Sequence, residues 1–160
     1  MNLQQLQAIF PSATTETWHQ HSNGGGWVEN TATVEESAFV GPDALVYGYA
    51  RVSGNARVSE NARVYENAWV YGNAWVNGNA RVCENARVYG NARVCENARV
   101  YGDARVFGYA RVSENALVYG NAIVYGDQAI SHGYYADEKP NDSAEMKVEQ
   151  ISRWEAILEE

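Results

Sequence analysis

Small and aliphatic residues alternate with polar ones along most of this chain, in a six-residue period. Alanine occupies position 32 and every sixth residue to 122, and valine occupies position 34 and every sixth residue to 124. Residues two apart share one face of a strand, so Ala and Val point inward and the residue between them, usually Arg, points outward. The following Gly or Glu and Asn or Asp are typical of turns, since Asn and Gly tolerate left-handed backbone. Each unit therefore predicts one short strand and one corner, and the units must stack to bury their apolar faces.

The outward position after each valine sorts with a period of eighteen residues rather than six. The three columns are Glu29, Tyr47, Tyr65, Cys83, Tyr101 and Tyr119; Glu35, Ser53, Tyr71, Tyr89, Phe107 and Tyr125; and Gly41, Ser59, Asn77, Cys95, Ser113 and Ser131. Two columns are mostly aromatic and the third is small. Three units per coil predict an all-β triangular prism of parallel strands, with 18 residues per coil, about six coils and a length of roughly 28 Å.

This stretch resembles the hexapeptide-repeat, or left-handed parallel β-helix, family, in which an aliphatic residue precedes a small one by four positions, as in Val40 and Ala44. The resemblance covers about two-thirds of the chain. The left-handed winding is implied by this resemblance alone. The general preference for right-handed parallel crossovers would indicate the opposite hand. The Gly-Gly-Gly-Trp-Val segment at 24–28, followed by near-identical Asn-Ala-Arg-Val-Tyr-Gly units, is similar to an uncharacterised bacterial and prophage-borne subgroup. That likeness implies a bacterial or phage origin and supplies no function.

The chain divides into three segments: an N-terminal helix and capping segment at 1–26, the β-helix at 27–132, and a loop with an amphipathic C-terminal helix at 133–160. Apolar residues at 3, 6, 9 and 10 predict a short helix over residues 2–10, which caps the open end of the prism. Residues 18–21 favour a strand. Apolar residues between 146 and 158 predict the second helix. Leu45, Leu117 and Ile123 replace arginine near the two ends of the rod, so we expect terminal segments or another chain to pack there.

Arginine repeats every eighteen residues on all three outward faces, so like charges stack along the rod. We expect tyrosine faces and glutamates to offset this repulsion; the glutamates are Glu60, Glu66, Glu84, Glu96 and Glu114. Trp69 and Trp75 replace arginine in consecutive units near one corner, which indicates a contact with another subunit or a partner. The candidate binding residues are Trp69, Tyr71, Trp75, Arg87, Tyr89 and Arg105. The alternative is that these ladders only coat the rod, copied by duplication of the unit.

Charge and cysteine spacing limit the classes of function. The net charge is −8 at pH 7, concentrated after residue 136, which argues against general affinity for nucleic acid. The start of the chain lacks a secretory signal, and no stretch has the length of a membrane span. Cys83 and Cys95 lie on different sides of the prism and cannot easily pair, which favours a reducing, cytoplasmic location.

Many members of the resembled family are acyltransferases that use acyl-CoA, with a histidine base, an inserted loop and a site between subunits of a trimer. This chain has no histidine between Trp27 and Ser131 and no inserted loop, so His132 is its one catalytic candidate. The zinc-dependent carbonic anhydrase branch needs three histidines at a subunit interface, and those are missing too. His19 and His21 are candidate metal ligands without a third nearby.

The sequence therefore favours a non-enzymatic structural or binding module without a cofactor. We expect it to form a homo-oligomer, with a trimer favoured and the column of small residues available for close approach. It would contact a protein or anionic partner through its outward ladders. The alternative is an acyltransferase that uses acetyl-CoA.

Overall fold

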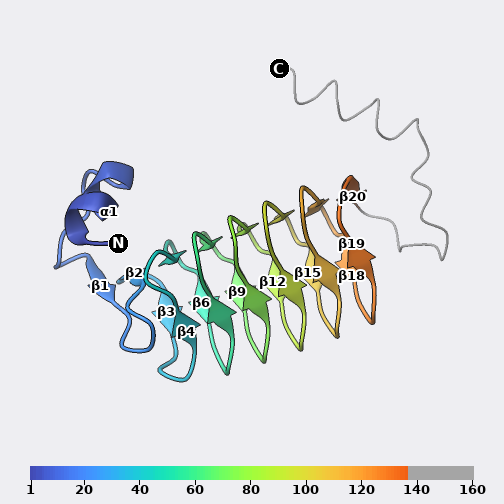
Figure 1. The fold of residues 1–160 in the computed structure, drawn as a ribbon, viewed down its shortest axis with the longest axis horizontal. Coiled ribbons are helices and arrows are strands. Elements are labelled where there is room, and N and C mark those ends of the chain that lie inside the picture. The colour runs from blue at the N-terminus through green and yellow to red at the C-terminus, as the bar shows by residue number, and fades with distance from the viewer. Residues whose placement is uncertain (137–160) are drawn as a thin grey trace, which may run out of the picture.

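Residues 1–136 are described by the computed structural model, which shows a rod of stacked short strands (Figure 1). The rod is a parallel β-solenoid of about six turns, so the predicted all-β architecture is confirmed. The helix expected near the C-terminus lies outside the described residues. The left-handed winding stays a prediction that rests on the resemblance.

Three sheets form the sides of the rod, and each coil gives one strand to each sheet. Sheet A contains β1 (Trp18–Gln20), β2 (Trp27–Glu29), β5 (Leu45–Val46), β8 (Arg63–Val64), β11 (Arg81–Val82), β14 (Arg99–Val100), β17 (Leu117–Tyr119) and β20 (Tyr134–Ala136). Sheet B contains β3 (Thr33–Val34), β6 (Arg51–Val52), β9 (Trp69–Val70), β12 (Arg87–Val88), β15 (Arg105–Val106) and β18 (Ile123–Val124). Sheet C contains β4 (Phe39–Val40), β7 (Arg57–Val58), β10 (Trp75–Val76), β13 (Arg93–Val94), β16 (Arg111–Val112) and β19 (Ala129–Ile130).

The eighteen-residue register predicted from the outward columns is confirmed strand by strand. Val82 pairs with Val64 on one side and with Val100 on the other, and Arg81 is flanked by arginines in the same way. The valines and alanines of the central coils are fully buried. The interior is therefore a stack of identical side chains, and on the outer faces arginines and aromatic residues repeat from coil to coil with interruptions such as Trp69 and Trp75.

The corners use their residues differently from the sequence prediction. Glycine and glutamate, not asparagine, adopt the left-handed conformation, with φ 59° at Glu66, 61° at Glu96 and 71° at Gly72. The asparagine that follows donates its backbone N–H to the carbonyl of the left-handed residue one coil on, as from Asn73 to Gly90 at 2.8 Å. Its side chain also extends an amide ladder, with 3.4 Å between Asn73 Nδ2 and Asn91 Oδ1. Asparagine is therefore selected for pairing between coils rather than for left-handed backbone.

The N-terminal segment packs against the first coils through sheet A. Helix α1 (Leu3–Ile9) begins with a capping box formed by Asn2 and Gln5. Leu6 is buried against Trp18, Trp27 and Leu45, so the prediction that a terminal segment covers Leu45 is confirmed. The buried residues of this hydrophobic cluster are Leu6, Ala13, Trp18, Trp27 and Leu45.

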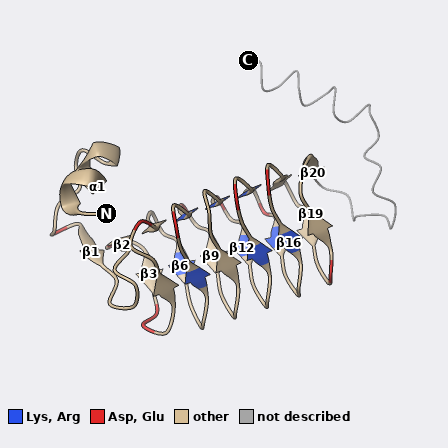
Figure 2. Cartoon of the chain, in the orientation of Figure 1, with Lys and Arg blue, Asp and Glu red and all other residues tan. Residues whose placement is uncertain are grey.

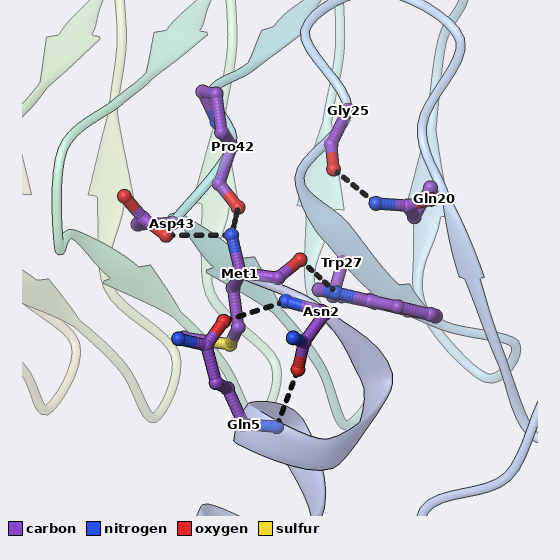
Figure 3. A network of polar contacts seen from close by, with 8 residues as sticks. All are labelled: Met1, Asn2, Gln5, Gln20, Gly25, Trp27, Pro42 and Asp43. Atoms are coloured by element: carbon purple, nitrogen blue, oxygen red, sulfur yellow. Dashed lines mark hydrogen bonds and ion pairs between the residues drawn. The ribbon is translucent and has the colours of Figure 1, made fainter.

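Polar contacts also join this cap to the rod (Figure 3). The Met1 amino group donates to the Pro42 carbonyl at 3.0 Å and to the Asp43 carboxylate at 2.7 Å. The indole of Trp27 donates to the Met1 carbonyl at 3.0 Å. The strand expected near Trp18 is confirmed as β1, which pairs antiparallel with β2. Apolar packing and hydrogen bonds thus both cover the open end of sheet A.

At the other end of the rod, β20 adds to sheet A by pairing parallel with β17, which places Tyr134 beside Leu117. Leu117 is therefore partly covered by a terminal strand, as its apolar character predicts. Within residues 1–136, no helix has the length and apolarity needed to cross a membrane.

Candidate binding surface

The six residues predicted to bind a partner lie around one edge of the prism. Five of them belong to sheet B or directly follow its strands, and Trp75 lies on sheet C. We define the B–C edge as the corners that join these sheets, at residues 53–55, 71–73, 89–91 and 107–109. Trp69 and Trp75 flank corner 71–73 but point from different faces. The structure therefore brings the six residues to one edge and does not place the two indoles on one surface.

Each of the two tryptophans lies between two arginines of neighbouring coils. Arg51 and Arg87 lie over the Trp69 ring at 5.8 and 5.7 Å from its centroid. Arg57 and Arg93 lie over the Trp75 ring at 5.2 and 4.9 Å. Each tryptophan therefore separates two like charges and attracts both through its ring face.

The rings that lie under arginine guanidinium groups in the described residues belong to tryptophan and phenylalanine, whereas Tyr47 meets Arg63 through a side-chain hydrogen bond. Arg57 also lies over the Phe39 ring, at 4.9 Å from its centroid. The expectation that tyrosine faces would play this part is wrong at these distances. The tyrosines stack on other rings of their own column instead.

The expected pairing of arginines with the corner glutamates is also wrong. Within residues 1–136 the one ion pair joins Met1 to Asp43, and no arginine takes part in one. Instead, the carboxylates of Glu66 and Glu96 accept the backbone N–H of the residue one coil on, at 2.7 Å each. The left-handed corner directs this amide toward the carboxylate, which holds the glutamate away from the guanidinium groups. The positive charges of the arginine ladders therefore have no carboxylate partner within residues 1–136.

Acidic residues are distributed unevenly among the three edges. The left-handed position of the B–C edge is glycine in successive coils, namely Gly54, Gly72, Gly90, Gly108 and Gly126. The other two edges carry glutamate there, at Glu66 and Glu84 between sheets A and B and at Glu60, Glu96 and Glu114 between sheets C and A. The B–C edge between residues 53 and 109 thus contains no acid while arginines flank it on both sheets, as the blue strands β6, β12 and β16 show (Figure 2).

An aromatic ladder follows sheet B along this edge. The Tyr71 and Tyr89 rings are stacked 4.8 Å apart, and Phe107 continues the stack 4.9 Å beyond Tyr89. Trp69 meets the ladder at Tyr71, with 4.9 Å between ring centroids. Burial raises the pKa of Tyr71, and the negative charge that Tyr89 would carry adds to the rise, while Arg87 and Arg105 oppose it. Tyr71 is therefore a neutral hydrogen-bonding group beside the arginines.

A hollow of about 400 Å³ lies on the opposite side of Trp69 from this ladder. Its lining includes Arg51, Trp69 and Arg87, and also Asp103, which lies at the corner between sheets A and B. Tyr49 stands at its rim with 69% of its surface exposed. The sequence alone marks Tyr49 as unusual, because it replaces the asparagine found at this corner position in most units. Its position beside Trp69 required the three-dimensional register.

The three histidines lie apart from this surface. His19 contacts Asn30 Oδ1 through Nδ1 at 2.7 Å, while His21 is buried with Nε2 2.9 Å from the Ala38 carbonyl. The two candidate metal ligands therefore have separate partners, and the described residues contain no group of three or more possible ligands. His132 is exposed, and its Nδ1 lies 2.8 Å from Ser131 Oγ.

The repeats are similar to a known solenoid family. The repeat described as YdcK Beta solenoid repeat matches residues 50–66, 56–72, 68–84, 98–114 and 110–126. These matches include Trp69, Tyr71, Trp75 and Arg105, while Arg87 and Tyr89 lie in the unmatched stretch 85–97. A comparison with curated proteins gave no match. Together, the matched repeats and the architecture define this chain as a β-solenoid repeat protein.

Proposed function

We propose that this protein is a non-enzymatic binding module whose sheet B surface, at the B–C edge, binds an acidic segment of a partner protein. The observation that carries the proposal is the set of unpaired arginines beside an edge without acids. Arg87 and Arg105 are neighbours in the ladder, and both are exposed. A guanidinium with no carboxylate partner is available to an incoming carboxylate.

Several weak contacts in register supply the affinity. An exposed ion pair contributes only about 0.2–1 kcal/mol, so one arginine does not bind a partner by itself. Arg87 and Arg105 lie on adjacent strands about 4.8 Å apart, and Arg51 lies two coils from Arg87 beyond Trp69, so carboxylates from several residues of one acidic segment can reach them. The adjacent ladder from Tyr71 to Phe107 adds apolar surface and hydroxyl groups.

Replacing Arg87 and Arg105 together by alanine tests this surface. We expect a peptide of ten glutamates flanked by tyrosines to bind the variant about tenfold more weakly, since two contacts of up to ~1 kcal/mol each are lost. Affinity is measured by fluorescence anisotropy at two salt concentrations, and thermal unfolding verifies that stability is nearly unchanged.

The matched control is the pair Arg63→Ala and Arg81→Ala on sheet A. It removes the same charge from neighbouring coils, but sheet A has glutamates on both of its edges, Glu66 and Glu84 on one and Glu60 and Glu96 on the other, whereas sheet B has them on one edge only. We expect a loss of less than about threefold. Equal losses in both double variants would show that net charge alone governs binding and would overturn the assignment to sheet B.

We also propose that three copies associate through sheet C. The column of small residues there lies low on the surface, with Cys95 and Ser113 each 8% exposed, while Trp75 on the same sheet is 41% exposed. An exposed indole beside a low, uncharged column is typical of an association surface. This assigns Trp75 to self-association and Trp69 to the partner surface.

Trp75→Arg separates these two roles because it restores the residue usual at this position of the repeat. We expect the wild-type protein to sediment as a trimer and the variant as a monomer with unchanged circular dichroism. Sedimentation velocity at micromolar concentration distinguishes the two states. A wild-type monomer, or a variant that remains trimeric, would contradict this use of sheet C.

A further inference from the structure

The aromatic column on sheet A has a gap one residue wide. Tyr47 and Tyr65 stack with ring centroids 4.9 Å apart and planes 3° from parallel. Tyr101 and Tyr119 stack at 5.3 Å and 11°. Cys83 occupies the same column on the coil between these two pairs. The column is therefore two stacked pairs separated by the space of one missing ring.

This gap is an open slot with aromatic residues on both sides. Its lining includes Tyr65, Cys83 and Tyr101, and Leu117 lies at its far end. The two tyrosines are two coils apart, which is about 9.6 Å, so an inserted ring would have about 4.8 Å to each neighbour. That spacing is the one the protein's own rings adopt. The slot has a volume of about 220 Å³, against roughly 150 Å³ for a cavity that holds benzene.

Charges at the slot select among planar ligands. Arg81 and Arg99 line one side and Glu84 lines another, so the lining carries one net positive charge. Neither arginine is in an ion pair with a described residue. The backbone N–H of Glu84 is already bonded to the Glu66 carboxylate. A ligand with a single negative charge therefore complements the slot.

We propose that the slot between Tyr65 and Tyr101 binds a small aromatic carboxylate, with its ring stacked in the gap and its carboxylate between Arg81 and Arg99. This site is on sheet A and shares no residue with the sheet B surface, so it does not depend on the function proposed above. Stacking supplies the attraction for any flat ring, and the two guanidinium groups supply the preference for an anion.

Binding at this slot is non-covalent. Burial raises the pKa of the Cys83 thiol, so at neutral pH the sulfur is protonated and a poor nucleophile. A hydrogen bond joins the Tyr65 hydroxyl and this sulfur. Cys83 therefore forms the floor of the slot and leaves room for a ring, which a tyrosine at this position would fill.

Cys83→Tyr is the decisive variant because it restores the residue usual at this position of the repeat. The test titrates 4-hydroxybenzoate into wild-type and variant protein and follows the Tyr65 and Tyr101 ring signals by NMR. We expect saturable shifts in the wild-type protein and at least tenfold weaker binding in Cys83→Tyr, which keeps its fold and gains thermal stability through the completed stack. Equal binding by both proteins would overturn the site.

Cys95→Tyr is the matched control, since Cys95 follows a valine in the same way but has Ser113 rather than an aromatic residue in the next coil. We expect it to bind 4-hydroxybenzoate as the wild-type protein does. Replacing Arg87 and Arg105 by alanine should also leave this binding unchanged, which separates the slot from the sheet B surface.

Two further measurements test the slot in the wild-type protein, without any substitution. 4-Hydroxybenzamide has the same shape without the charge, and we expect it to bind at least tenfold more weakly than the acid. Saturating acid should also slow alkylation of Cys83 by N-ethylmaleimide, read by mass spectrometry, while alkylation of Cys95 is unchanged. Equal binding of acid and amide, or equal protection of both cysteines, would overturn the proposal.

Discussion

Val88→Asp should unfold the protein. Val88 is fully buried in the stack, with Val70 on one neighbouring coil and Val106 on the other. The substitution loses the burial of a valine, about 1.5–3 kcal/mol, and places a carboxyl group in an interior without polar partners, which costs several kcal/mol more. The sum of about 5 kcal/mol or more equals the whole stability of many domains.

The position of Val88 increases this effect. In a solenoid each coil contacts only its neighbours, so a defect in a middle coil separates the two halves of the stack. We expect the variant to lose its β-sheet circular dichroism and its cooperative unfolding transition at room temperature.

Arg87→Asp is the control, because it introduces the same side chain one residue earlier on the exposed side of β12. It loses a contact with the Trp69 ring, and we expect a change of less than about 1 kcal/mol in the free energy of unfolding. Chemical denaturation of both variants measures the difference. A folded Val88→Asp protein with a transition like that of Arg87→Asp would contradict the fully apolar interior.

The interior and the strand register were predictable because both follow from local periodicity. The place of a residue in the six-residue unit decides whether its side chain points into or out of the prism. The eighteen-residue coil decides which residues lie beside it on the neighbouring strands, so Val82 pairs with Val64 and Val100. The covering of Leu45 was predictable for a similar reason. An apolar residue in an outward, otherwise charged position requires something to pack on it.

The partners of the charged residues were not predictable in this way. A glutamate such as Glu66 has a choice between a guanidinium and a backbone amide, and corner geometry decides in favour of the amide. The contrast in charge between the three edges depends on the same corner geometry. The left-handed corner residue is glycine on the B–C edge, whereas the other two edges carry glutamate at several of these positions. The gap at Cys83 is visible in the sequence column, but its meaning depends on rings that stack face to face on either side.

The turn that joins the cap to the rod makes the second large prediction. Gly24 has φ +116°, and a Cβ there would lie 2.2 Å from the Val40 carbonyl oxygen. Neither atom can move freely, because the Val40 carbonyl accepts the Gly26 N–H at 2.9 Å and the Val40 N–H donates to Asn23 at 3.0 Å. Gly24→Ala must therefore displace the turn from β4. We expect a loss of about 3 kcal/mol or more, from the strained conformation and the clash together.

Gly25→Ala is the matched control for this strain. Gly25 also has positive φ, +76°, but a Cβ there meets nothing within 4 Å. It should cost only about 1–2 kcal/mol, which is the penalty for left-handed backbone without a clash. With Trp69, Trp75 and Trp154 replaced by phenylalanine in both variants, tryptophan fluorescence reports the cap through Trp18 and Trp27, while circular dichroism reports the rod. We expect Gly24→Ala to lower the denaturation midpoint of the fluorescence signal well below that of Gly25→Ala. Equal midpoints would mean that the turn at 23–26 is not held against β4, and that the cap is joined to the rod through sheet A alone.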